Sequence, residues 1–114
     1  MSSEVKRGEI YWVDWAPARG SEQKGKRPAL VIQNDIGNRL SSTIIVATCS
    51  TKFTKAYPFQ VFVEAQDSGL TDDCIIDLAQ IITIDKSRLL KKCGKLSKDK
   101  MYEVNKALEI SLGL

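Results

Sequence analysis

Residues Glu9–Trp15, EIYWVDW, set the fold class of this chain; they follow Gly8 and end shortly before Pro17. Aromatic and β-branched residues dominate the segment, and their side chains alternate along it. This pattern is typical of a β-strand with one buried face, because successive side chains of a strand point to opposite sides. We therefore predict that the fold begins with a strand.

The segments downstream repeat the pattern at short intervals. Apolar runs suited to buried strands lie at residues 29–33 (ALVIQ) and 43–49 (TIIVATC), and an alternating run lies at 58–65 (PFQVFVEA). The long apolar stretch 74–84 (CIIDLAQIITI) predicts one bent strand or two short ones, and residues 85–88 then predict a turn or a single helical turn. Segments rich in Gly, Asn, Asp and Ser separate these runs and predict turns.

Only the end of the chain has the pattern of a helix. Ser97 can cap its N-terminus, and Leu96 and Met101 can pack together across that cap. Five or six short strands and one terminal helix predict a small, strongly bent antiparallel barrel or sandwich, in a single domain over residues 1–114. The helical face that would cover it consists of Met101, Val104, Leu108 and either Ser111 or Leu112.

The bulk composition limits what the chain can be. Its 114 residues fit one globular domain, and 43% hydrophobic with 27% charged residues argues against a disordered or fibrous chain. Seventeen Lys and Arg against fourteen Asp and Glu give a net charge of +3, which permits an RNA partner without indicating one. The start MSSEVKRGEI has no apolar run, and no stretch reaches membrane-spanning length, so we expect a cytoplasmic protein without a membrane segment.

Histidine and closely spaced cysteines, the usual ligands of transition metals, are missing from the sequence. The chain has no histidine, which is the commonest metal ligand and the commonest general base. Cys49, Cys74 and Cys93 lie far apart without a C-x-x-C pair, so we expect reduced thiols. There is no G-x-S-x-G segment and no phosphate-binding G-x-x-x-x-G-K-[ST] loop, which argues against a serine hydrolase and a P-loop nucleotidase. We therefore expect no metal site and no cofactor.

Residues 18–26, ARGSEQKGK, form a polar segment with two glycines and three basic residues, which predicts a long mobile loop. Arg27 follows it at the mouth of a buried strand, where a guanidinium can recognise phosphate; the ordinary alternative is a solvated arginine. Glu22 is the nearest acidic residue, and its alternative is a surface carboxylate. Lys24 and Lys26 are candidate phosphate contacts.

Polar side chains at strand ends are further candidates. Ser50 and Thr51 follow the strand TIIVATC on opposite faces, so one hydroxyl could enter a cleft, although such hydroxyls usually form turns. Gln33 and Asn34 could contact base edges, and Asn34 could equally start a helix or a turn. Trp12 could stack a base or pack in the core.

The segment RGEIYWVDWAPARGSEQKGKRPALVIQND, residues 7–35, closely resembles the opening of the MazF/PemK family of endoribonuclease toxins. The likeness continues through VATCST, YPFQVFVE and TIDK to the terminal helix, and G-S-E-Q-x-G-x-R-P is its most specific part. The resemblance implies an SH3-like barrel of the CcdB/PemK kind, a homodimer and an antitoxin partner of MazE type. It also implies sequence-specific cleavage of single-stranded RNA, mostly messenger RNA.

Carried over by position, the resemblance makes Arg27 the catalytic arginine, Glu22 the loop glutamate and Ser50 the strand-end hydroxyl. Members of the family usually have threonine in place of Ser50, so the hydroxyl is kept and the methyl group that restricts its rotamer is lost. The residues that we expect to contact the RNA around them are Gln23, Lys24, Lys26, Gln33, Asn34 and Thr51.

The expected reaction is attack by the ribose 2′-hydroxyl on the adjacent phosphorus, with Arg27 stabilising the added charge, Ser50 orienting the phosphate and Glu22 or a positioned water taking the proton. Two other classes of function stay open. One is a CcdB-like toxin that binds DNA gyrase without catalysis. The other is an RNA-binding module that has lost its activity.

Overall fold

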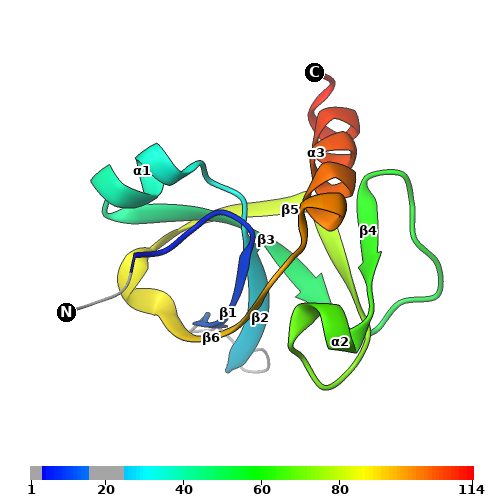
Figure 1. Cartoon of the computed structure of the whole chain (residues 1–114), viewed down its shortest axis with the longest axis horizontal. Helices are drawn as coiled ribbons and strands as arrows, with labels where there is room; N and C mark the ends of the chain where they lie inside the picture. Colours follow the sequence, from blue (N-terminus) through cyan, green and yellow to red (C-terminus); the bar gives the residue numbers. More distant parts are fainter. Residues whose placement is uncertain (1–3, 16–24) are drawn as a thin grey trace.

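The computed structural model describes residues 4–15 and 25–114, which contain six strands, three α-helices and one 3-10 turn (Figure 1). In chain order they are β1 (Glu9–Asp14), β2 (Lys26–Val31), α1 (Asp35–Leu40), β3 (Thr43–Ser50), β4 (Gln60–Val63), α2 (Ala65–Ser68), β5 (Cys74–Asp85), η1 (Lys86–Arg88), β6 (Leu89–Lys95) and α3 (Lys98–Leu112).

All six strands join one sheet in the order β4-β5-β3-β2-β1-β6, and every neighbouring pair is antiparallel. Strand β5 holds the sheet together: its first residues pair with β4 and with the end of β3, and its last residues pair with the start of β3. The sheet bends strongly, with β1 and β6 on one side and β4 on the other (Figure 1). This confirms the predicted fold class, although the order of the described strands ends at β4 and β6 instead of closing into a barrel.

The predicted strands at 9–15, 43–49 and 58–65 appear as β1, β3 and β4, and the stretch 74–84 forms the single bent strand β5. The turn η1 follows it, as predicted. The predicted loop end at Lys26 was wrong, because β2 starts at that residue and includes Pro28. Strand β6 was not predicted, since LLKKCGK has little apolar alternation and owes its conformation to backbone pairing with β1.

Helix α1 follows Asn34, in agreement with the helix start that the sequence left open for that residue, whereas the short helix α2 was missed. In α1 the side chain of Asn34 accepts a hydrogen bond from the N–H of Gly37, which satisfies one of the free donors of the first turn. In α2 the helix ends at Gly69, whose φ of 84° is the left-handed conformation that glycine adopts readily. Both helices are too short for apolar periodicity to reveal them.

Helix α3 begins as predicted at Ser97, whose hydroxyl accepts a hydrogen bond from the N–H of Lys100. It buries Val104 and Ala107 against the sheet, and the hydroxyl of Ser111 donates to the carbonyl of Leu78 at 2.8 Å. Leu112 is exposed, so of the two predicted alternatives Ser111 lies on the packed face. None of the described helices is long and apolar enough to span a membrane.

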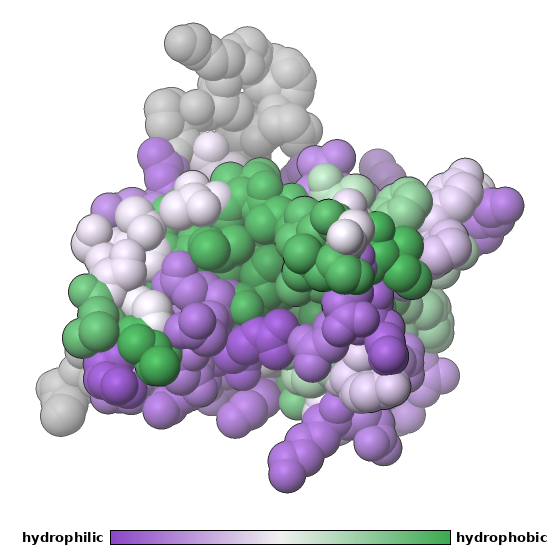
Figure 2. Space-filling view, turned by 90° about the horizontal axis from the view of Figure 1, so that it is seen from above, coloured by the Kyte–Doolittle hydropathy of each residue, from purple (hydrophilic) through white to green (hydrophobic). Residues whose placement is uncertain are grey.

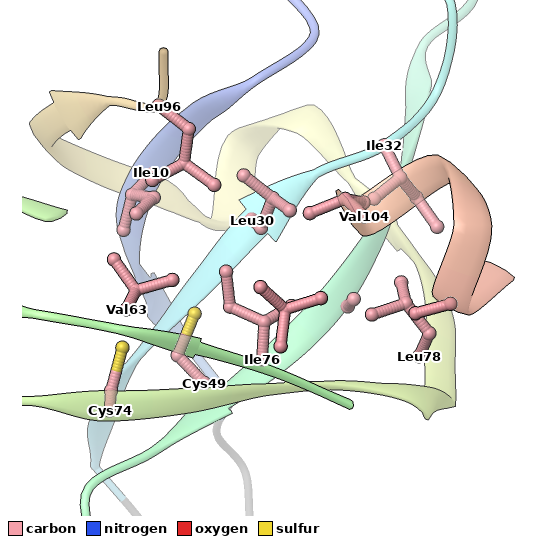
Figure 3. Close-up of a cluster of buried hydrophobic side chains, with 13 residues drawn as sticks. Ile10, Leu30, Ile32, Cys49, Val63, Cys74, Ile76, Leu78, Leu96 and Val104 are labelled. Atoms are coloured by element: carbon pink, nitrogen blue, oxygen red, sulfur yellow. The ribbon is translucent and has the colours of Figure 1, made fainter. Parts of the chain in front are cut away.

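The larger hydrophobic cluster lies between α3 and the sheet (Figure 3). Buried aliphatic side chains of β1, β2, β4 and β5 meet the helix there, and the thiols of Cys49 and Cys74 complete the cluster. A smaller cluster occupies the other face and consists of Val13, Ala29, Val31, Ile44, Val46 and Ile84.

The smaller cluster is bordered by a buried carboxylate. Glu9, only 4% exposed, accepts hydrogen bonds from the Lys6 N–H at 2.9 Å and the Tyr11 hydroxyl at 3.1 Å. The ammonium of Lys92 forms an ion pair with it at 2.9 Å. Burial, the negative charge of Glu9 and the hydrogen bond between Tyr11 and Glu9 raise the pKa of Tyr11 to about 12.

Candidate active site

Strands β2 and β3 part at one end of the sheet. Their pairing runs from Val31 opposite Val46 to Ala29 opposite Thr48 and stops there. The next residue towards the N-terminus is Pro28, which has no N–H to donate to a neighbouring strand. Beyond this point the two strands border a pocket of about 650 Å³.

Four predicted site residues line this pocket: Lys26, Arg27, Ser50 and Thr51. If this register is continued two residues beyond the last β2–β3 pair, Arg27 corresponds to Ser50. Residues opposite one another on antiparallel strands project from the same face of a sheet. The arginine and the hydroxyl that the family likeness singled out therefore project from one face of neighbouring strands, and both side chains are exposed.

The hydroxyl of Ser50 is held by a local turn. Its Oγ accepts a hydrogen bond from the N–H of Lys52 and donates to the carbonyl of Lys52, each at 3.1 Å. The turn-forming role that the sequence left open is thus present. The same turn fixes the hydroxyl at the rim of the pocket, because Ser50, Thr51 and Lys52 all line it.

Two of the predicted RNA contacts lie elsewhere. Gln33 and Asn34 follow the far end of β2, away from the pocket lining. The amide of Gln33 donates to the side chain of Asn38 and to the carbonyl of Thr43, each at 2.9 Å, and Asn34 caps α1. These contacts give both residues structural roles. Three further predicted residues lie outside the described ranges: Glu22, Gln23 and Lys24.

Asp77 is a pocket residue that the sequence analysis missed. Ala47 of β3 pairs with Ile81, but the next residue, Thr48, pairs with Asp77, so residues 78–80 of β5 form a bulge. A bulge bends a strand and re-aims its side chains. The carboxylate of Asp77 lies beside Thr48 and lines the pocket. The available signal was a single acidic residue near the start of a long apolar run.

The pocket lining has more cationic than anionic side chains. Lys26, Arg27 and Lys52 are the cations, and Asp72 and Asp77 are the carboxylates. Such a site suits an anionic group that also offers hydrogen-bond donors, as an RNA chain does. In residues 4–15 and 25–114, no group of three or more His, Cys, Asp and Glu side chains is placed to hold a metal ion.

Trp12 and Cys49 also line the pocket. Trp12 is 36% exposed, so its indole belongs to the pocket rim and not to the core. A hydrogen bond with the Cys74 thiol, together with burial, raises the pKa of Cys49. Cys49 therefore stays a protonated thiol near neutral pH and is not a nucleophile here. All three cysteines are free, as predicted.

A small bent antiparallel sheet, a helix packed across it and a pocket at a strand end place the chain in the class of small, mainly β proteins with a C-terminal helix. Within that class, the chain belongs to the family described as PemK-like, MazF-like toxin of type II toxin-antitoxin system, whose model matches residues 6–112. This match confirms the resemblance that the sequence indicated.

Solved structures agree with this assignment. MazF from Deinococcus radiodurans is 25% identical with a TM-score of 0.78, over 99% of this chain and 100% of that one. An endoribonuclease in complex with its cognate antitoxin, from a mycobacterial species, is 24% identical with a TM-score of 0.80, over 96% of each chain. A MazE–MazF complex from D. radiodurans is 24% identical with a TM-score of 0.80, over 98% of this chain and 99% of that one.

Proposed function

We propose that this toxin is a sequence-specific endoribonuclease that cuts single-stranded RNA, chiefly messenger RNA, in the cytoplasm. The observation that carries the proposal is the placement of Arg27 and Ser50 on one face of two parted strands, in a pocket with an excess of cationic side chains. The similar mycobacterial structure is named as an endoribonuclease, which supports the same activity here. A single strand suits the pocket because its bases are free for contact.

In the proposed reaction the substrate supplies the nucleophile. The ribose 2′-hydroxyl attacks the adjacent phosphorus in line and the 5′-oxygen leaves, which gives a 2′,3′-cyclic phosphate and a 5′-hydroxyl. Arg27 stabilises the charge that builds on the phosphoryl oxygens, because a guanidinium stays protonated and can donate two parallel hydrogen bonds. Ser50 orients the phosphate. This reaction needs neither a metal ion nor a cofactor.

A proton acceptor is still required for the 2′-hydroxyl, and a carboxylate is the natural candidate in a chain without histidine. We assign this role to Glu22, on the basis of the family likeness. Asp77 is the alternative, because its carboxylate lines the same pocket as Arg27 and Ser50. If Glu22 is the base, Glu22→Gln removes the fall in rate at low pH. If Asp77 is the base, Asp77→Asn removes it.

We also propose a MazE-type antitoxin as the inhibitor. Two of the similar structures are complexes of this kind, one with a cognate antitoxin and one of MazE with MazF. An acidic segment would suit a pocket whose rim carries Lys26, Arg27 and Lys52. Such a segment would inhibit by filling the pocket, without unfolding the toxin.

A homodimer is the assembly that we propose for the free toxin. Figure 2 shows a broad hydrophobic area, framed by hydrophilic side chains, on the side of the molecule where the C-terminus lies. Ile110, Leu112 and Leu114 at the end of α3 are each more than half exposed. Apolar patches of this kind mark association surfaces. Sedimentation of Leu112→Asp should give a monomer if this surface holds the dimer, whereas an unchanged mass would contradict that placement.

The first experiment incubates the purified chain with a long single-stranded RNA in the presence of EDTA. Discrete cuts that carry 5′-hydroxyl ends would support the proposal and reveal the cleavage sequence. Arg27→Ala should lower the rate by at least ~10²–10³, the typical loss for one such donor. Arg39→Ala, an exposed arginine at the end of α1, is the matched control and should cut normally.

The other two classes of function predict different results in the same experiment. A gyrase-binding toxin would leave purified RNA intact and would not retain it. An inactive RNA-binding module would retain RNA without shortening it. Cleavage by Arg27→Ala at the normal rate would contradict the catalytic assignment, even if the chain cuts RNA.

Substitutions at Ser50 test the orienting role. Ser50→Ala removes the hydroxyl and should slow cleavage, whereas Ser50→Thr restores the residue usual in the family and should cut at least as fast as the parent. The methyl group of threonine restricts χ1, so the hydroxyl is held in fewer orientations. Equal single-turnover rates for Ser50→Ala and the parent would remove Ser50 from the mechanism.

The pH–rate profile identifies the base. A carboxylate base gives a rate that falls as the pH drops below its pKa, because the protonated form cannot accept a proton. Glu22→Gln should abolish this acidic limb if Glu22 is the base, and Asp77→Asn should leave it in place. The reverse result would transfer the role to Asp77, and a limb retained in both variants would exclude each of them.

A further inference from the structure

We infer that an exposed aromatic and basic surface next to the pocket binds the single-stranded RNA beside the scissile phosphate by stacking its bases. This surface, the β3–β4 platform, consists of Phe53, Tyr57 and Phe62 with Lys52 and Lys55. The inference rests on the proposed ribonuclease function and assigns these residues to substrate binding.

The platform exposes aromatic rings to water, which is unfavourable unless a partner covers them. Residues 51–58 are all exposed, and Phe53, Tyr57 and Phe62 show 39%, 49% and 38% of their surfaces. Clustered exposed apolar groups mark binding sites more often than isolated ones do. Stacking on aromatic side chains is the usual way in which proteins hold unpaired bases.

The rings are already ordered by contacts with one another. Phe53 meets Phe62 edge to face, with centroids 5.9 Å apart and planes at 67°. Tyr57 stacks on Phe59 at 5.6 Å with planes only 6° apart. Because these contacts hold the rings in place, less side-chain entropy is lost when a base stacks on them.

The platform adjoins the candidate catalytic residues. Phe62 pairs with Ile75 of β5, and Ile75 pairs with Ser50 of β3, so Phe62 and Ser50 project from the same face. Two strand spacings separate them, which is about 10 Å. Lys52 lines the pocket and precedes Phe53 directly. An RNA strand whose phosphate is bound at Ser50 can therefore extend across the surface of the sheet to the platform.

The charges of the platform favour an anionic partner over an apolar one, and its exposed rings favour unpaired bases over the carboxylates of a protein segment. Residues 51–63 contain Lys52 and Lys55 and no acidic residue. The ammonium of Lys55 lies over the Tyr57 ring, 5.1 Å from its centroid. Because the lysine side chain is flexible, its ammonium can move to a phosphate while the ring stacks the attached base.

The matched control is a second lysine–tyrosine pair on α3. Tyr102 is 61% exposed, and the ammonium of Lys106 lies 5.4 Å from its ring centroid. This pair has the same chemistry as Lys55 with Tyr57 but belongs to α3, whereas Lys55 and Tyr57 follow the pocket residues Ser50–Lys52 along the chain. If exposed tyrosine and lysine side chains bound RNA indiscriminately, both pairs would contribute.

The test measures binding and cleavage separately in the full chain. The probe for binding is a fluorescent RNA that the parent cuts, with a single 2′-deoxy nucleotide at the mapped cleavage position, so that the attacking hydroxyl is missing. Phe53→Ala and Tyr57→Ala should each raise its Kd by about tenfold, whereas Tyr102→Ala should leave it unchanged. On the cleavable RNA both variants should raise KM and retain kcat, since stacking beside the scissile bond binds ground state and transition state alike.

Phe53→Leu separates stacking from packing, because leucine keeps an apolar side chain without a ring. It should lose affinity as Phe53→Ala does, and thermal unfolding should show that both variants are folded. Unchanged Kd and KM in Phe53→Ala and Tyr57→Ala would overturn the inference, while Arg27-dependent cleavage by the same proteins would leave the ribonuclease function standing. Equal losses in Tyr102→Ala would also overturn it.

Discussion

The side of the sheet under α3 and the end where β2 and β3 part are built from different kinds of residue. Under α3 the buried side chains are aliphatic, apart from two thiols, and they pack against a capped helix. At the parted end the pairing of β2 with β3 stops, and a bulge in β5 turns Asp77 towards the pocket. Charged and hydroxyl side chains line that pocket. The first region stabilises the fold by packing, whereas the second exposes polar side chains where the pairing of the sheet is interrupted.

This difference suggests that stability and activity can be changed independently. Substitutions under α3 remove buried apolar contacts and leave the pocket lining in place. Substitutions at Arg27 or Ser50 touch exposed side chains that contribute little burial. Measurements of unfolding and of cleavage in the same variants test that separation.

The largest loss of stability is expected for Ile10→Ala. Ile10 is fully buried in the cluster under α3, and truncation of such a side chain leaves a cavity. The free energy of unfolding should fall by about 4 kcal/mol, measured by urea denaturation. Cleavage by the remaining folded protein should be unchanged below its unfolding transition. A loss of kcat in the folded variant would show that the two regions are coupled.

Gly69→Ala should affect both regions. A Cβ at Gly69 would clash with the carbonyl oxygen of Cys93 in β6, and φ is 84° there. The combined strain should cost about 3 kcal/mol, and cleavage should weaken because Leu70 to Asp72, which line the pocket, follow directly. Gly113→Ala is the control: its φ is 75°, but nothing lies within 4 Å of the added Cβ. It should cost about 1–2 kcal/mol and leave cleavage intact.

Ser97→Ala should weaken the helix that covers the larger cluster. The Ser97 hydroxyl accepts a hydrogen bond from the Lys100 N–H at 3.2 Å, and loss of such a cap costs about 1 kcal/mol. Ser97→Asp keeps an acceptor at the same position and places a negative charge at the positive end of the helix dipole, so it should retain most of the stability. A thermal unfolding series of the three proteins measures the effect. Equal stability of Ser97→Ala and the parent would show that the cap contributes nothing here.

Tyr11, on the face opposite α3, should give the stability a pH dependence in the alkaline range. Its pKa is raised from the ordinary value near 10 to about 12, chiefly by burial and then by Glu9. The folded state therefore holds the proton more tightly than the unfolded state, so this contribution is present below pH 10 and is lost as the pH rises towards 12. Tyr11→Phe should show a shallower loss of unfolding free energy between pH 10 and 12. Parallel curves for the two proteins would contradict the raised pKa.

Much of the fold could be predicted because strands and helices leave periodic patterns along the chain. The alternation at 9–15 and the apolar runs at 43–49 and 74–84 gave strands in the right places, and Ser97 marked the start of α3. Strand β6 could not be predicted in this way. Its lysines give no alternation, and its conformation depends on hydrogen bonds to β1, a strand at the other end of the sequence.

The candidate site was only partly predictable for a related reason. The family likeness indicated Arg27 and Ser50 as site residues, and the structure places them on neighbouring strands. Asp77 gave no usable signal, because a bulge in the pairing of β3 with β5 brings it to the pocket. Gln33 and Asn34 had suitable side chains, yet hydrogen bonds around α1 hold them away from it.

Short-range periodicity, capping and local motifs were enough to indicate which segments are extended, where the last helix starts and which family the chain resembles. The strand order, the end of the β2–β3 pairing and the meeting of Arg27, Ser50 and Asp77 in one pocket became known from the folded structure alone. Strand pairing and bulges depend on backbone hydrogen bonds between residues far apart in the chain, and no local pattern indicates which residues will pair.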